Sequence, residues 1–378
     1  MTARERLLSA LRLKRIDRVP VSPDISIIYP AMYSGKPFWE VLLYENPPVW
    51  KIIADLGEEY GFDVMLQVPM DKSSTEQEIE STKIIEKNED CQLVEHIYYT
   101  PYGQLTQTVQ YPISEAPWRT VALVKDVEED MKKILALFQN PQGKGIANIE
   151  KAKKYIGDRG LVGDYIGVPS YYWCLVRGSI QDAIMDYYDY PAVMRRFTKS
   201  YLEYGLEYIQ SSCERARPDY FMFGGSYASM SVISPDFYKE HNLLFVQKAT
   251  DMLKRFGIPS CLHMCGRSNE MIEVFANETN LNMLEPLEGE PGGNVVLSEV
   301  KRKYGHKLCL KGNINTFDIL ERSTPLKVTE EVRRCINDAA AGGGFILSTG
   351  DQVTRDTPEE NFVALISAAH HYGRYTHH

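Results

Sequence analysis

The sequence predicts an α/β protein: a (β/α)8 barrel forming one domain over residues 1–378, with a small antiparallel β-meander inserted at about 81–118. Eight short apolar segments recur along the chain, and helical spacing of apolar residues follows each one. This alternation is typical of parallel strands joined by right-handed crossovers, and eight such strands close a barrel. A doubly wound open sheet is the competing fold, but no glycine-rich dinucleotide turn follows the first segment.

Each expected element follows from its local pattern. Buried strands are short apolar runs bounded by Gly, Pro or charged residues, and helices show apolar residues three and four apart. The expected strands are 18–24, 61–69, 160–167, 220–224, 260–265, 281–285, 307–312 and 345–350. The expected helices are 3–14, 38–60 with a break at 47–48, 126–138, 147–156, 171–212, 235–255, 268–279, 297–304, 325–340 and 358–371. Alternating residues separated by turns at 88–90 and 101–103 predict the meander.

Composition excludes several classes of function. The net charge of −9 and the pI of about 5.5 argue against nucleic acid as a partner and against attraction to an anionic membrane. No apolar run approaches the roughly 18 residues that span a bilayer, and the charged amphipathic start is unlike a signal peptide. Seven irregularly spaced cysteines fit a reducing compartment, so we expect a cytoplasmic protein. The sequence is also compatible with a homodimer.

The most informative stretch is Pro259–Gly266, an apolar strand that leads into a helix. His263 and Cys265 are two residues apart, so they are expected on one face at the carboxyl end of that strand. Chemistry in an α/β barrel takes place at this end, and imidazole with thiolate is a zinc-binding pair. The alternative is a core cysteine beside a hydrogen-bonded histidine.

Polar residues end several other strands, where burial is costly unless they are paired. The strand-end set comprises Asp24, Asp164, Tyr165, Gly224–Ser226, His263, Cys265, Glu285, Asn313 and Asp351. His263, Cys265, Glu285 and Asp351 offer nitrogen, sulfur and two oxygen ligands for zinc. Gly342–Gly344 is compatible either with a phosphate cradle or with the end of a helix.

Several segments resemble the uroporphyrinogen decarboxylase superfamily, whose fold is a (β/α)8 barrel. They are Ile233–Tyr238, His263–Gly266, Tyr304–Gly305, Leu310–Ile314, Gly342–Leu347 and Thr357–Asn361. Decarboxylases of this superfamily carry an arginine-rich N-terminal motif that grips porphyrinogen carboxylates. The corresponding residues 19–26 contain no arginine, which disfavours a substrate with many carboxylates.

The resemblance is stronger to the corrinoid-dependent methyltransferases of this superfamily. These use zinc held by an H-x-C pair, an acidic residue after the next strand and a late cysteine. His263, Cys265 and Glu285 match, but Asp351 stands where the cysteine is expected. A carboxylate in place of a thiolate makes zinc a harder Lewis acid, better matched to an ether oxygen. The spacing of Glu270, Glu285 and His306 is also similar to a motif of aryl methyl ether methyltransferases, although His306 precedes its strand and should lie at the opposite end of the barrel.

The resemblance therefore implies a zinc-dependent methyltransferase that moves a methyl group from a small methylated substrate, an aryl methyl ether, to a separate corrinoid protein. Glu285, Asp24 and Tyr165 are the expected catalytic residues. Tyr171, Tyr227 and Asn313 are expected to bind the substrate. One alternative is a metal-independent decarboxylase of a smaller acid, using Tyr165, Asp24 and Arg177. Another is a non-catalytic, corrinoid-handling barrel.

Overall fold

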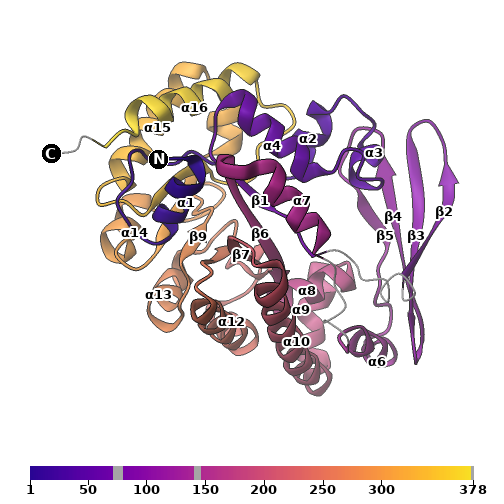
Figure 1. Ribbon diagram of the computed structural model, residues 1–378. Coiled ribbons are helices and arrows are strands. Elements are labelled where there is room, and N and C mark those ends of the chain that lie inside the picture. Colours follow the sequence, from indigo (N-terminus) through magenta and orange to yellow (C-terminus); the bar gives the residue numbers. More distant parts are fainter. Residues whose placement is uncertain (71–79, 140–145, 376–378) are drawn as a thin grey trace.

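Buried apolar residues form seven parallel strands in the order β1-β6-β7-β8-β9-β10-β11 in the computed structural model, which describes residues 1–70, 80–139 and 146–375. The strands are β1 (Val64–Gln67), β6 (Gly160–Gly167), β7 (Tyr220–Gly224), β8 (Ser260–His263), β9 (Met283–Glu285), β10 (Cys309–Ile314) and β11 (Phe345–Thr349). The sheet curls around a central axis and helices surround it (Figure 1). The predicted α/β barrel is confirmed.

Residues 18–24, predicted as the first strand, lie in the eighth position without forming a regular strand. Val21 makes an isolated parallel bridge to Leu347, and Ser22 N–H donates to Leu347 O at 2.9 Å. On the other side, Asp63 N–H donates to Val21 O at 2.7 Å, one residue before β1 begins. Because Pro20 and Pro23 have no N–H to donate, this segment cannot build a full ladder. It nevertheless closes the gap between β11 and β1.

Helices follow the strands, and side-chain caps mark where several of them begin. The helices are α1 (Ala3–Leu11), α2 (Ile28–Tyr33), α3 (Phe38–Leu42), α4 (Val49–Tyr60), α6 (Val127–Leu137), α7 (Ala147–Ile156), α8 (Pro169–Arg177), α9 (Ile180–Asp189), α10 (Pro191–Ser211), α11 (Pro235–Tyr238), α12 (Leu244–Phe256), α13 (Asn269–Glu278), α14 (Leu297–Tyr304), α15 (Pro325–Ala339) and α16 (Glu359–Tyr372). Thr324 caps α15 by accepting a hydrogen bond from Lys327 N–H, and Pro325 occupies the first turn, as is typical of helix starts. None of the described helices has the length and apolar character needed to cross a membrane.

Helix α1 closes the amino-terminal end of the barrel. Its apolar residues and Ile16 pack against inward-facing side chains of the strands, forming a separate interior cluster. The cluster comprises Leu7, Ala10, Leu11, Ile16, Leu161, Tyr220, Met222, Cys261, Met283, Cys309 and Ile346. Since this end of the barrel is filled, the site cavity lies at the carboxyl ends of the strands.

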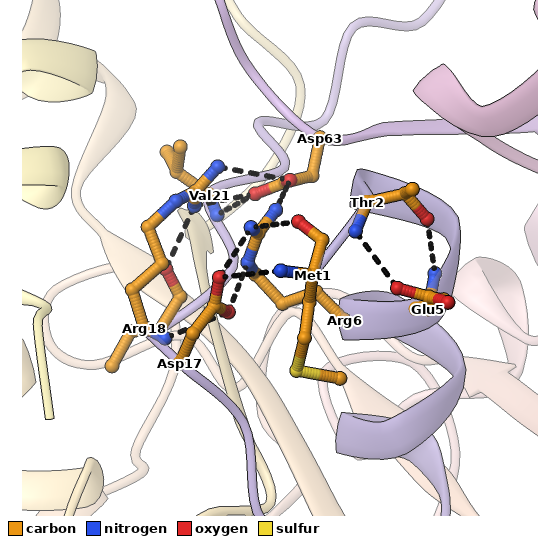
Figure 2. A network of polar contacts seen from close by, with 9 residues as sticks. Met1, Thr2, Glu5, Arg6, Asp17, Arg18, Val21 and Asp63 are labelled. Atoms are coloured by element: carbon orange, nitrogen blue, oxygen red, sulfur yellow. Dashed lines mark hydrogen bonds and ion pairs between the residues drawn. The ribbon is translucent and has the colours of Figure 1, made fainter. Parts of the chain in front are cut away.

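Buried charges fix α1 to the barrel (Figure 2). Arg6 donates to Asp17 and to Asp63, each at 2.7 Å. Asp63 also accepts from Arg18 at 2.7 Å and from Val21 N–H at 2.9 Å. The network therefore joins α1, the eighth-position segment and the start of β1 through a single carboxylate. A buried carboxylate is tolerated here because every oxygen has a charged or N–H donor.

The predicted meander is a four-stranded antiparallel sheet that stands beside the barrel, at the right of Figure 1. It comprises β2 (Glu80–Lys87), β3 (Cys91–Thr100), β4 (Gly103–Pro112) and β5 (Trp118–Val121). Val94, Leu105 and Val109 are buried, whereas Trp118 and Val121 of the edge strand are exposed. The meander thus uses one face for packing and extends slightly beyond the predicted 81–118.

Candidate active site

Strand register brings three polar side chains to one level of the barrel interior. His263 is paired with Glu285 across β8 and β9, and Leu284 with Leu310 across β9 and β10, so Lys311 comes level with Glu285. Alternation along a strand turns these three side chains inward together. His263 and Glu285 are the last residues of their strands, at the end where barrel enzymes place their chemistry, and Lys311 lies level with them in the middle of β10.

Glu285 lies between two nitrogen donors. Its Oε1 is 3.0 Å from His263 Nδ1, and its Oε2 is 2.5 Å from Lys311 Nζ. The side chains of Glu285 and Lys311 are almost fully buried. Burial raises the pKa of Glu285, but the charge of Lys311 and the contact with His263 outweigh burial, so the pKa is lowered overall. The carboxylate is thus charged and engaged through both oxygens.

Asp24 supplies a second carboxylate close to His263. Its Oδ2 lies 3.9 Å from His263 Nδ1. The backbone of Asp24 is held from both sides, since its N–H donates to Thr349 Oγ1 at 3.1 Å and its C=O accepts from Val353 N–H at 2.8 Å. Burial raises the pKa of Asp24 above its usual value. Asp24 therefore lies at the mouth without an ion pair as close as that of Glu285.

His263 also lies near a thiol and a further carboxylate. One ligand atom each from His263, Cys265 and Asp351 lies within 4.8 Å of the others. A second group, Asp24, His263 and Glu285, meets the same distance. The four predicted zinc ligands are therefore divided between two groups that share His263. Cys265 comes from the loop after β8, because this strand ends at His263 and not at Cys265 as predicted.

Side chains from neighbouring loops fix the segment that carries Cys265. Glu288 accepts a hydrogen bond from Gly266 N–H, and Ser231 Oγ accepts one from Arg267 N–H at 2.9 Å. Gly266 has a φ of +79°, and a Cβ there would lie 2.5 Å from Ser231 Oγ. Only glycine suits this left-handed turn with so close a neighbour. The turn therefore sets the position of the thiol.

Tyrosines form one wall of the site, and glycines make room for them. Tyr171 and Tyr227 are stacked, with ring centroids 5.3 Å apart. A Cβ on Gly224 would lie 1.8 Å from Tyr165 Oη, and one on Gly167 would lie 2.5 Å from the Tyr171 ring. Burial raises the pKa of Tyr165, so its hydroxyl remains protonated.

A cavity of about 530 Å³ opens at these strand ends. Of the predicted site residues, it gathers Asp24, Tyr165, Tyr171, Tyr227, His263, Cys265, Glu285 and Asp351. Within the described part of the chain, Lys311 is the only lysine that lines the cavity, and no arginine does.

Other candidates lie elsewhere. Asn313 lines a neighbouring cavity of about 680 Å³, where its side chain donates to Leu287 O and accepts from Arg334. Asp164 bonds to Tyr208 and Ser212, outside the barrel interior. Glu270 accepts from Arg267 and Asn294 on the surface. Arg177 pairs with Asp186 at 3.0 Å and does not line the site cavity.

Sequence reasoning missed Lys311 and Glu288. A signal for Lys311 was present: Cys309 and Lys311 alternate along the strand, and Cys309 belongs to the interior cluster. Period two therefore places Lys311 inside the barrel, one level nearer the mouth. Glu288 follows β9 in a loop of irregular conformation, for which residue spacing gives no direction.

Comparisons with known proteins agree with this architecture. A family model described as uroporphyrinogen decarboxylase (URO-D) matches residues 146–372, more than half of the chain. Among solved structures, a methyltransferase from Methanosarcina mazei is similar with a TM-score of 0.68 and 19% identity, covering 98% of this chain and 99% of that one. A B12-independent methionine synthase from Shewanella sp. W3-18-1 gives a TM-score of 0.50 at 12% identity, covering 94% of this chain and 96% of that one. At these identities the similarities establish the fold.

Curated relatives match over shorter segments. The uroporphyrinogen decarboxylase of Actinobacillus succinogenes is 34% identical over 83 residues, which are 22% of this chain and 23% of the relative. That of Methylobacillus flagellatus is 37% identical over 76 residues, 20% of this chain and 21% of the relative. The matched segments span less than a quarter of these relatives. Together with the family model over residues 146–372, they show that the chain belongs to the uroporphyrinogen decarboxylase family.

Proposed function

We propose that this protein is a zinc-dependent methyltransferase that moves a methyl group from an aryl methyl ether to a corrinoid carried by a separate protein. The observation that carries the proposal is the approach of His263, Cys265 and Asp351 to one another beside a tyrosine wall. Imidazole, thiolate and carboxylate are all zinc ligands, and three protein ligands leave one position for a substrate oxygen.

The donor set is suited to this ion. Tetrahedral ligands at about 2.0–2.3 Å from zinc are separated by roughly 3.3–3.8 Å, so ligand atoms within 4.8 Å of one another need only small side-chain adjustments. His263, Cys265 and Asp351 would hold the metal, which would polarise the ether oxygen as a Lewis acid. One thiolate and one carboxylate balance the two positive charges.

The chain's own residues would orient the substrate. Tyr165, Tyr171 and Tyr227 form an aromatic wall against which a single ring can pack. The protonated Tyr165 hydroxyl can donate a hydrogen bond to the oxygen that leaves as phenolate. The corrinoid of the partner would accept the methyl group, and the electrons of the C–O bond would stay with the oxygen, which would leave as phenolate. Holding the methyl group in line with the open mouth would contribute much of the rate.

A decarboxylase of a small acid is the second candidate. Lys311 provides one cation inside the cavity, near Asp24 and Tyr165, although Lys311 is paired with Glu285. Arg177, the cation expected for this chemistry, lies outside the cavity, paired with Asp186. Because no arginine among the described residues lines the cavity, a porphyrinogen with many carboxylates is a poor match.

Elemental analysis with a transfer assay tests the proposal. We expect about one zinc per wild-type chain, and loss of zinc in Cys265→Ala and Asp351→Ala. Transfer from 2-methoxyphenol to free Co(I) cobalamin, followed by absorbance, is expected for wild type and abolished in both variants. A folded wild-type chain without zinc would contradict the proposal. Release of carbon dioxide from a small aromatic acid would favour the decarboxylase.

A further inference from the structure

The pairing of Glu285 distinguishes it from the other predicted zinc ligands. One carboxylate oxygen contacts His263 Nδ1 at 3.0 Å and the other contacts Lys311 Nζ at 2.5 Å. Both partners lie on adjacent strands at the same level, so the row follows from the register of β8, β9 and β10. Both oxygens of Glu285 are thus already engaged with buried nitrogens, and Glu285 stands outside the group formed by His263, Cys265 and Asp351.

We propose that Glu285 is not a metal ligand but a positioning residue, held by Lys311, that fixes the orientation and tautomer of His263. This inference rests on the proposed zinc site. In the proposed arrangement, His263 Nδ1–H donates to Glu285 Oε1, which leaves Nε2 unprotonated for the metal. Histidine ligands commonly donate their other ring N–H to a carboxylate, which sets the ring orientation.

Lys311 is the second positioning residue. A carboxylate as deeply buried as Glu285 needs a counter-charge, and Lys311 supplies it from inside the barrel. Asp24 carries a further acidic group close to His263, at 3.9 Å. Lys311 therefore keeps Glu285 charged and in place, so that Glu285, and not Asp24, accepts the hydrogen bond from His263 Nδ1–H.

Zinc competition with a chromogenic chelator tests both residues. In Glu285→Gln the amide oxygen can still accept from Nδ1–H, so we expect one zinc per chain with affinity about 10- to 100-fold weaker. Lys311→Met, which keeps an unbranched chain one atom shorter and removes the charge, should weaken affinity by a similar factor. The matched control is Lys301→Met, since the Lys301 amine bonds to Gly343 O, away from the cavity. Its zinc affinity should equal that of wild type.

Two results would overturn the inference alone. Complete loss of zinc in Glu285→Gln, with wild type still binding one zinc, would make Glu285 a ligand. Tighter zinc binding in Lys311→Met would show that Lys311 competes with the metal for Glu285. A wild-type chain that binds no zinc would overturn the inference together with the proposed function.

Nitrogen-15 NMR reads the tautomer in wild-type protein, so it does not depend on how well Glu285→Gln or Lys311→Met folds. In zinc-loaded wild-type protein with ¹⁵N-labelled histidine, His263 should keep its proton on Nδ1 and bind zinc through Nε2. A proton on Nε2 would contradict the inference. His263→Gln serves to assign the signal.

Discussion

Gly224 determines how closely Tyr165 approaches strand β7. A Cβ at this position would lie 1.8 Å from Tyr165 Oη and 2.5 Å from its Cζ, so Gly224→Ala must displace the ring. Overpacking of this kind typically costs about 1–3 kcal/mol. We expect urea denaturation to show a loss of that size, and fluorescence titration to show weaker binding of 2-methoxyphenol in the narrowed cavity.

Gly289→Ala is the matched control, because a Cβ there would meet its nearest neighbour at 3.5 Å, an ordinary contact. Its free energy of unfolding should lie within about 0.5 kcal/mol of wild type. If Gly224→Ala equals wild type in stability and in binding, the Tyr165 ring moves freely. Tyr165 would then not be a rigid part of the aromatic wall.

Single residues show where sequence reasoning succeeds and where it stops. His263, Glu285, Asp24 and Asp351 were predicted because each ends an apolar segment, and the structure places all four in one cavity. Asn313 and not Lys311 was predicted as the site residue of this strand, although strand alternation points Lys311 inward. The pairing of Glu285 with two donors depends on register between strands, which residue spacing within a strand does not contain.

Asp17 contributes, beside Asp63, to the attachment of helix α1 through Arg6, and this contribution gives stability a pH dependence. The hydrogen bond from Arg6 lowers the pKa of Asp17. A group whose pKa is lower in the folded state stabilises the protein fully above its unfolded pKa, near 3.9. This stabilisation declines below that pH and is gone once the pH falls through the lower, folded-state pKa. The Asp17 side chain is 35% exposed, so solvent screening limits the contribution to about 1 kcal/mol.

We therefore expect Asp17→Asn to be less stable than wild type at pH 7 and to approach it by pH 3. Urea denaturation at pH 7, 5 and 3 measures the difference. Asp318→Asn is the control, because Asp318 is exposed and lies 3.7 Å from an exposed Arg322. It should follow wild type at every pH. A constant gap between Asp17→Asn and wild type would show that the ion pair contributes nothing to the pH profile.

At the scale of elements, helices and central strands were predictable because their periodicity is strong. The segment at 18–24 was only partly predictable. Its apolar residues indicate a strand, but Pro20 and Pro23 lack the N–H groups that would donate hydrogen bonds to neighbouring strands. Strand β8 was predicted two residues too long, because apolar character continues into the turn at Met264. Apolar runs show burial, whereas strand ends depend on hydrogen bonding that the sequence does not display.

Across the whole molecule, the hydrophobic core is built without the candidate metal site. The buried hydrophobic residues that form the core do not include Cys265, and His263 and Asp351 line the cavity with it. These three residues lie at the mouth, on loops or the last residue of a strand. The fold should therefore form without metal, in contrast to small zinc domains that unfold when the ion is removed.

Chelation tests this separation of core and site. We expect chelator-treated protein to keep its far-ultraviolet circular dichroism, since the core supplies the stability. Zinc at 100 times its dissociation constant should add about 2.7 kcal/mol, which for a chain of 378 residues raises the melting temperature by about 3 °C. Cys265→Ser should fold equally well and show no such rise. Unfolding on chelation would mean that the ion holds the barrel mouth together as a structural ion. Because structural ions have a closed coordination shell, no position would then remain for a substrate oxygen, contrary to the proposed function.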